Sequence, residues 1–288
     1  MANTLTLDLM ELDGKATPIA IANEIFRQNP SLQGPVPVEE FATLVGIEKI
    51  AELTTEGFEG ALITNPEKSC GVIMVKGGVN PQRRRFTIGH ELGHFLLPWH
   101  RQTSFNCKQE DIKDSSDGLG RTSAAGVRQD IETEANSFAS ELLMPRVQFK
   151  AKLKAYGEPE LGHLLELASN YDASVEATVW RYKALSDYPV AFVFSHNNVV
   201  RYWTRAAEFP YTLCVRKGHS LPTQSPARQN GQGISDWDEV DSYQWLEENK
   251  RNQLPDTVLE QTLYQQDGYK VTLLYIEELP DEDEEGNV

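Results

Sequence analysis

The chain has 288 residues, of which 40% are hydrophobic and 24% charged, a composition typical of a folded globular protein. This length is enough for one large domain or two smaller ones. The formal net charge of −16 at pH 7 disfavours general attraction to the phosphates of a nucleic acid. The composition therefore excludes wholesale disorder and argues against a nucleic-acid-coating protein.

The cysteines and the N-terminus predict where the protein resides. Cys70, Cys107 and Cys214 lie far apart in sequence, which favours free thiols in an intracellular protein over a disulfide framework. The first residues, MANTLTLDLMELDG, show no signal-peptide pattern. No run reaches the roughly 18 apolar residues that a membrane-spanning helix needs. We therefore expect a cytoplasmic protein that has no membrane partner.

Hydrophobic spacing and turn residues predict the elements in chain order. Helices are expected at 17–26, 35–47, 86–97, 130–145 and 146–156, with two more within 159–185. Strands are expected at 60–64, 70–75, 190–195, 199–203, 257–265 and 269–276. The segment 101–127 is poor in apolar residues and is expected to be a long polar loop. Helices dominate up to about residue 187, and strands follow.

One of these helices carries a candidate metal-binding motif, RRRFTIGHELGHFLLPW at residues 83–99. His90 and His94 lie one helical turn apart, so their rings can converge on one ion, and Glu91 projects beside them. Gly89 and Gly93 each cost a helix about 0.8–1 kcal/mol relative to alanine. A helix tolerates this cost where another backbone must come close. The alternative is a core helix that carries histidines incidentally.

A catalytic zinc site with two histidines needs a third protein ligand and leaves a fourth position for water. The extended pattern HExxHxxGxxH is absent, so we expect a glutamate from a second helix. In the stretch IETEANSFASELLMP the apolar residues form one stripe, and Glu134 borders it. Asp130 and Glu141 lie along the same side. An acidic group held near an apolar face needs a compensating cation, so we predict Glu134 as the third ligand.

The two blocks RRRFTIGHELGHFLL and ETEANSFASELLMP together resemble the ImmA/IrrE family of bacterial and phage metallopeptidases. The similarity covers roughly residues 15–185. It implies a zinc endopeptidase with one Zn2+ per chain, held by His90, His94 and Glu134, with Glu91 as the catalytic base. It also implies a protein substrate, a helix-turn-helix repressor whose cleavage relieves repression.

Two further features of the reaction stay open at the level of sequence. His100 and Tyr156 are both candidates for stabilising the oxyanion, and spacing does not decide between them. The strand 70–75 is our candidate for the edge that aligns the substrate backbone. The arginine run 83–85 could bind an acidic substrate segment, although such runs are more often solvated helix starts.

The resemblance and the element pattern together predict an α+β fold. Residues 1–187 are expected to form a mostly helical, zincin-like peptidase domain with a small β-sheet. Residues 188–280 are expected to form a smaller α/β domain, for which a GAF-like regulatory domain is one interpretation. Residues 281–288 end an acidic stretch that carries seven carboxylates between 277 and 285, and we expect them to form a solvated tail.

Residues 161–185 have a pattern typical of a helix-turn-helix, which would indicate a DNA-binding regulator. DNA recognition needs basic side chains around the second helix, and residues 172–180 contain no Lys or Arg. Direct DNA binding is therefore disfavoured, and the segment is expected to complete the peptidase domain. A non-proteolytic anti-repressor that keeps the fold is the other alternative, and the intact Glu91 argues against it.

Overall fold

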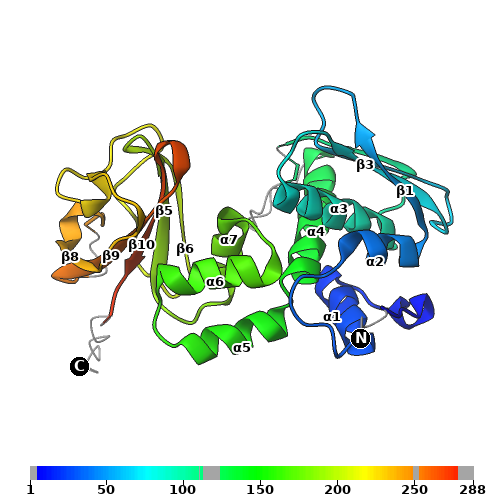
Figure 1. Ribbon diagram of the computed structural model, residues 1–288, viewed down its shortest axis with the longest axis horizontal. Helices are drawn as coiled ribbons and strands as arrows, with labels where there is room; N and C mark the ends of the chain where they lie inside the picture. The colour runs from blue at the N-terminus through cyan, green and yellow to red at the C-terminus, as the bar shows by residue number, and fades with distance from the viewer. Residues whose placement is uncertain (1–4, 110, 113–123, 249–252, 278–288) are drawn as a thin grey trace, which may run out of the picture. The chain divides into compact units, whose positions relative to one another are not determined.

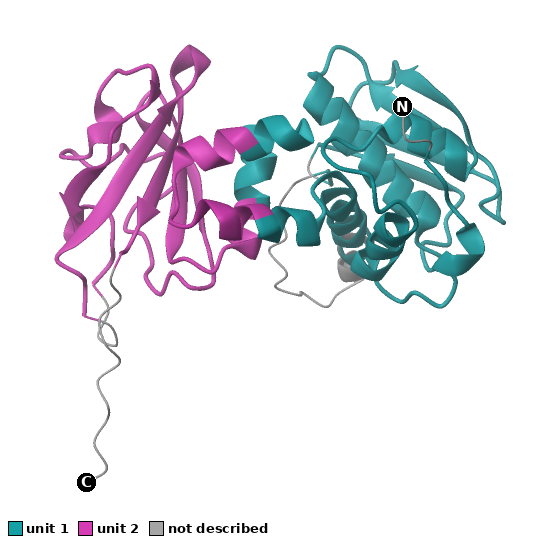
Figure 2. Cartoon of the chain, turned by 60° about the horizontal axis from the view of Figure 1, so that its bottom comes forward, with its two compact units in different colours: residues 1–151, 167–181 teal, residues 152–166, 182–288 magenta. Residues whose placement is uncertain are grey.

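The computed structural model describes residues 5–109, 111–112, 124–248 and 253–277, so the predicted acidic tail at 281–288 lies outside the described residues (Figure 1). The chain forms two compact units, one of residues 1–151 and 167–181 and the other of residues 152–166 and 182–288 (Figure 2). Helices α5 (Arg146–Tyr156), α6 (Leu161–Tyr171) and α7 (Val175–Leu185) contain residues of both units. These units differ from the single boundary at residue 187 that the sequence predicts.

The first unit contains a four-stranded sheet of β1 (Ile47–Leu53), β2 (Gly60–Thr64), β3 (Gly71–Lys76) and β4 (Ser104–Cys107). The strand order is β1-β3-β2-β4, with β1 parallel to β3 and the other pairs antiparallel. The hairpin predicted at 60–64 and 70–75 is confirmed. The prediction missed β1, which begins where a helix was expected to end, and β4, which lies in the segment predicted to be a loop.

The helices of this unit are α1 (Pro18–Gln28), α2 (Val38–Val45), α3 (Pro81–Leu96) and α4 (Ala124–Leu143), preceded by a short 3-10 turn at Leu9–Leu12. Helix α3 begins before the predicted Phe86 because the Asn80 side chain accepts a hydrogen bond from the Arg83 amide, and Pro81 fits the first helical position. Helix α2 ends at Gly46, whose φ of 107° requires glycine.

Helices α3 and α4 pack closely, and this contact positions the candidate metal centre. A Cβ added at Gly93 would lie 3.0 Å from the Ala135 Cα, and one at Gly89 would lie 3.3 Å from the Ala139 Cβ. The expectation that these glycines admit a neighbouring backbone is therefore confirmed. The buried core around the two helices includes Ile88, Leu92, Phe95, Phe138 and Leu142.

The second unit contains an antiparallel sheet of β5 (Val190–His196), β6 (Val199–Arg205), β7 (Gly233–Ile234), β8 (Asp238–Asp241), β9 (Thr257–Tyr264) and β10 (Tyr269–Tyr275). The order is β6-β5-β10-β9-β7, with β8 also paired to β9. Both predicted hairpins are confirmed, and their turns use positive φ at Asn197, Asn198 and Asp267. Short 3-10 turns occur at Pro226–Arg228, Ser242–Gln244 and Gln266–Gly268.

The seven helices and two sheets of the described residues confirm the α+β class. Within those residues, no helix has both the length and the apolar character required to cross a bilayer.

Candidate metal centre

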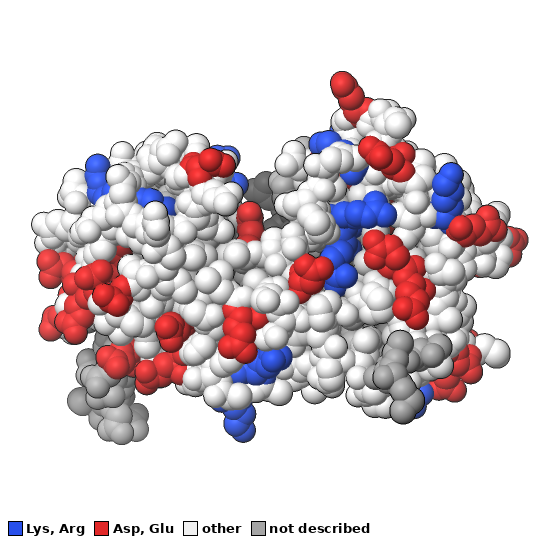
Figure 3. Space-filling view, in the orientation of Figure 1, with Lys and Arg blue, Asp and Glu red and all other residues white. Residues whose placement is uncertain are grey.

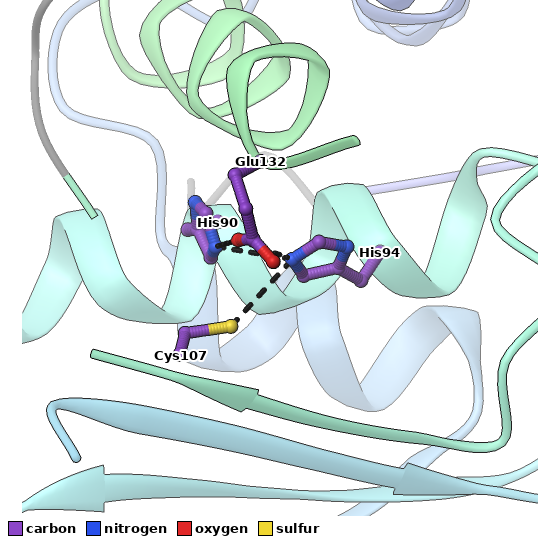
Figure 4. A group of neighbouring side chains, drawn as sticks. All are labelled: His90, His94, Cys107 and Glu132. Carbon is purple, nitrogen blue, oxygen red and sulfur yellow. Dashed lines mark hydrogen bonds and ion pairs between the residues drawn. The ribbon is translucent and has the colours of Figure 1, made fainter. Parts of the chain in front are cut away.

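Four potential metal ligands converge between helices α3 and α4 and strand β4 (Figure 4). They are His90, His94, Glu132 and Cys107, and their ligand atoms all lie within 4.8 Å of one another. The Glu132 Oε2 atom lies 3.1 Å from the Nε2 atom of His90 and 3.2 Å from that of His94. The two Nε2 atoms are 3.1 Å apart. All four residues are buried.

The hydrogen bonds behind His90 determine which of its ring nitrogens donates. The Asn136 amide donates through Nδ2 to the Asp111 carbonyl at 2.8 Å, which leaves its Oδ1 as an acceptor. The His90 Nδ1 atom lies 2.9 Å from this Oδ1 and must donate to it. In a neutral ring the His90 Nε2 atom then carries a lone pair that points into the cluster.

A longer chain of hydrogen bonds orients His94 in the same way. The Glu134 Oε2 atom accepts from Trp99 Nε1 at 2.6 Å and from His100 Nε2 at 2.9 Å. The His100 Nδ1 atom is then an acceptor, and it lies 3.0 Å from His94 Nδ1. His94 therefore donates through Nδ1 and presents a lone pair from Nε2. We name Glu134, His100 and His94 the relay.

Burial keeps the ring of His94 neutral, whereas the neighbouring histidines keep the carboxylate of Glu132 charged. Burial lowers the pKa of His94 to about 3. Burial alone would raise the pKa of Glu132, but the adjoining imidazoles of His90 and His94 outweigh this and hold the pKa well below its usual range. Burial likewise lowers the pKa of His100.

These residues fit a divalent metal. The Nε2 atoms of His90 and His94 and the Oε2 atom of Glu132 are three electron-pair donors that meet with no proton between them, and such atoms repel unless a cation lies among them. Donors at 2.0–2.1 Å from one tetrahedral zinc would be roughly 3.3 Å apart. The observed separations of 3.1–3.2 Å are close to this value. Two imidazoles and one carboxylate are a donor set that zinc accepts.

Glu91 lies beside the cluster with its carboxylate buried. Neither oxygen has a hydrogen-bond partner among the described residues. A Cβ added at Gly60 of β2 would lie 2.5 Å from the Glu91 Oε1, so glycine at this position makes room for the carboxylate. Burial raises the pKa of Glu91 to about 7, against the opposing effect of His90. A carboxyl group of this kind can take up and release a proton near neutral pH.

The structure brings together three of the four residues that the sequence selected. His90 and His94 lie within the cluster, and Glu91 lies beside it. Glu134 does not reach the histidine pair, because its carboxylate is turned to Trp99 and His100. Glu132, two residues earlier on α4, contacts both histidines instead.

Sequence reasoning also missed Cys107 and the supporting Asn136. Asn136 lies one turn after Glu132, so both side chains share the face of α4 that meets His90. That i, i+4 spacing was an available signal. Cys107 gave none, because its contact with the cluster depends on a strand that was not predicted. His100 has both ring nitrogens engaged, which leaves it no free donor for an oxyanion.

The arginine run at the start of α3 is paired with acidic groups of the same unit. Arg83 lies 3.6 Å from Glu59, and Arg85 lies 3.2 Å from Asp172. Arg84 lies 3.6 Å from Glu39. These arginines are therefore engaged within the unit, which weakens the suggestion that they bind an acidic substrate.

Comparisons with known proteins identify the part of the chain that carries this centre. Residues 49–183 match the model of a peptidase family described as the IrrE N-terminal-like domain. The radiation response metalloprotease IrrE of Deinococcus radiodurans is 29% identical over 121 residues, which cover 42% of this chain and 33% of the relative. The protein of the same name from Deinococcus deserti is 31% identical over 121 residues, covering 42% of this chain and 39% of the relative.

The match therefore spans little more than a third of the length of these curated relatives. A solved structure of a Mycobacterium tuberculosis transcriptional regulator superposes with a TM-score of 0.53, covering 90% of this chain and 76% of that one. At 15% identity this likeness concerns the fold alone. The HExxH helix and the second helix both lie within the matched residues 49–183, so this part of the chain is an IrrE N-terminal-like domain of the ImmA/IrrE metallopeptidase family.

Proposed function

We propose that the protein is a zinc-dependent endopeptidase with one zinc ion per chain, held by His90, His94 and Glu132. The observation that carries this proposal is the convergence of three unprotonated donor atoms at 3.1–3.2 Å, supported from behind by Asn136 and the relay. The predicted ligand Glu134 is replaced by Glu132. Zinc bound there would polarise a peptide carbonyl and activate water.

Glu91 is the proposed catalytic base. Its carboxylate is buried, has no hydrogen-bond partner among the described residues and lies on the same helix as both histidines. It can accept a proton from the attacking water and pass it to the leaving amine. Gly60 of β2 leaves space for this carboxylate, which a Cβ at that position would occupy.

The substrate backbone is proposed to pair with strand β4 rather than with the predicted strand 70–75. That strand, β3, lies between β1 and β2, so both of its edges are already used. Among the described strands, β4 pairs with β2 alone and is an edge of the sheet, where an extended peptide can add. Phe105 of β4 stacks on His94 with ring centroids 4.2 Å apart, which places this edge beside the metal centre.

The proposed substrate is a helix-turn-helix transcriptional repressor, whose cleavage relieves repression under stress. The support is the family membership together with the net charge of −16, which suits steering of a basic DNA-binding partner. Figure 3 shows acidic and basic side chains interspersed on one face, with no broad basic surface. Such steering should weaken as salt is added.

A DNA-binding function for α6 and α7 is not favoured. Arg181, a basic residue of the second helix, is buried against Glu141 at 2.7 and 2.9 Å. Asp172, in the turn between the helices, is held by Arg85 and by Gln82 of α3. These contacts lie within the first unit and leave Arg181 unable to contact a phosphate.

Metal analysis of the purified chain tests the ligand assignment. We expect one zinc per wild-type chain and a marked loss in His90→Ala, His94→Ala and Glu132→Ala. Glu91→Gln should retain zinc and lose turnover. Full zinc occupancy in Glu132→Ala, with loss of zinc in Glu134→Ala, would show that Glu134 and not Glu132 is the third ligand.

Co-expression with a helix-turn-helix repressor encoded by a neighbouring gene tests the reaction. Fragments found by mass spectrometry with the wild type but not with Glu91→Gln would support a peptidase. A stable complex with both forms and no fragments would instead favour the anti-repressor alternative. Increasing salt should slow cleavage if the acidic charge steers the encounter.

We also propose a regulatory or substrate-recruiting role for residues 188–280, which could include a GAF-like arrangement. The support is that this region has its own antiparallel sheet and its own buried core around Trp245. Tyr243 and Tyr269 are exposed aromatic side chains of this unit. Changing both to serine should alter cleavage of the repressor while leaving cleavage of a short peptide intact; equal effects on both substrates would contradict the proposal.

A further inference from the structure

Cys107 is the fourth member of the metal cluster, and no step of the proposed hydrolysis uses it. It ends strand β4 and is fully buried. Its Sγ atom lies 3.6 Å from the Nε2 atom of His94, on the side of the cluster opposite α4 (Figure 4). The thiol therefore lies where a fourth ligand would complete the three donors of the two helices.

The distance agrees with shared coordination. A sulfur at about 2.3 Å and a nitrogen at 2.0–2.1 Å from one tetrahedral zinc would be roughly 3.6 Å apart. The sulfur is observed 3.6 Å from His94 Nε2, while the nitrogen and oxygen donors are 3.1–3.2 Å apart. The longer separation between the sulfur and His94 Nε2 therefore fits a mixed set of donors.

A cysteine binds a metal ion as the thiolate. A divalent cation deprotonates a thiol that coordinates it, so the same site favours the thiolate once it is loaded.

We propose that Cys107 is a fourth zinc ligand and that the resulting closed site of two histidines, one glutamate and one cysteine keeps the zinc-loaded chain latent. This inference rests on the zinc binding proposed above. A hydrolytic zinc site keeps one position open for water, whereas four protein ligands are typical of a structural site. The thiolate holds the position that water needs, next to the buried carboxylate of Glu91.

Strand β4 couples this ligand to the proposed substrate edge. Cys107 pairs with Gly60 in the β2–β4 ladder, so the thiol is carried by the strand on which we place the substrate. Pairing of a peptide with β4 can move Cys107 away from the cluster. Binding of the correct substrate would then open the coordination position, which would give the enzyme a narrow specificity.

Cobalt substitution tests the ligand directly, because a thiolate bound to Co2+ gives a sulfur-to-metal charge-transfer band in the near ultraviolet. We expect this band in the Co2+-loaded wild type and in the control variants Cys70→Ala and Cys214→Ala. Cys107→Ala and the nearly isosteric Cys107→Ser should bind Co2+ without the band. A wild type that binds Co2+ without the band, or a variant of Cys107 that keeps it, would overturn the assignment.

Zinc affinity and turnover provide the second readout. Competition with a chromophoric chelator should show zinc binding weakened at least about tenfold in Cys107→Ala and in Cys107→Ser. Cleavage of a short peptide at saturating zinc should be faster in both variants than in the wild type. Equal or slower cleavage by folded, zinc-loaded variants would refute latency. Failure of the wild type to bind zinc would instead refute the proposed function, so the two failures are distinguishable.

Discussion

The relay predicts that Glu134 supports the metal ligand His94 and is not itself a ligand, unlike Glu132 on the same helix. The Glu134 Oε2 atom accepts two hydrogen bonds, at 2.6 Å from Trp99 and at 2.9 Å from His100. Without this acceptor, the proton of His100 is no longer held on Nε2 by a hydrogen bond. If the proton moves to Nδ1, His100 can no longer accept the hydrogen bond from the N–H of His94. The ring of His94 is then no longer held with its Nε2 lone pair directed at the metal.

The expected effect is a loss of zinc affinity, not of zinc binding. Loss of the outer partners of metal-ligating histidines typically costs 10–100-fold in affinity, or about 1.4–2.7 kcal/mol. The Glu134 side chain is 37% exposed, so solvent screens the loss of its charge. Glu134→Gln, which keeps an acceptor oxygen, should weaken zinc binding about tenfold. Glu134→Ala, which leaves both donors unpaired, should lie towards a hundredfold.

Competition with a chromophoric chelator measures these affinities, and the thermal midpoint of the metal-free protein controls for a general loss of stability. Asp130→Asn is the matched control, because Asp130 is an exposed carboxylate of the same helix. It should bind zinc like the wild type. If Glu134→Ala binds zinc as tightly as Asp130→Asn, the relay does not orient His94. If it binds no zinc at all, Glu134 is a ligand and our assignment of Glu132 is wrong.

Three further predictions concern stability. Gly93→Ala should destabilise the metal-free protein by about 1–3 kcal/mol despite the higher helix propensity of alanine, because its Cβ meets the backbone of α4; an unchanged urea midpoint would contradict this close contact. Glu141→Ala should lower the free energy of unfolding by about 3–5 kcal/mol because it leaves the buried Arg181 without its carboxylate partner. The double change Glu141→Leu with Arg181→Met should recover much of that loss in the same urea titration. Hydrogen bonds from Arg27 help lower the pKa of Glu24 from 4.5 to about 2, so the stability it contributes is present above pH 4.5 and lost as pH falls towards 2. The difference in unfolding midpoint between wild type and Glu24→Gln should shrink over that range, and a difference independent of pH would refute the ion-pair explanation.

Local signals predicted most elements because each depends on a few neighbouring residues. Positive φ at Asn197 and Asn198 closes one hairpin, and the Asp-Gly turn closes another. Strand β4 escaped prediction for a physical reason. Only Phe105 and Cys107 point inward along its four residues, and so short an alternation cannot be distinguished from a loop. Its pairing with β2 is a long-range contact that no local pattern encodes.

The sequence alone could not decide which glutamate of α4 faces the two histidines. Glu132 and Glu134 both border the apolar stripe of α4, but two residues advance a helix by about 200°, so they leave it on opposite flanks. Which flank faces the histidines depends on how α3 and α4 cross, and the close contact of Gly93 with Ala135 sets that crossing. Asn136 lies four residues after Glu132 and binds His90, so the two side chains form one face that only this crossing brings to the metal centre. The opposite flank carries Glu134 to Trp99 and His100, where its carboxylate can orient the ring of His94 through His100.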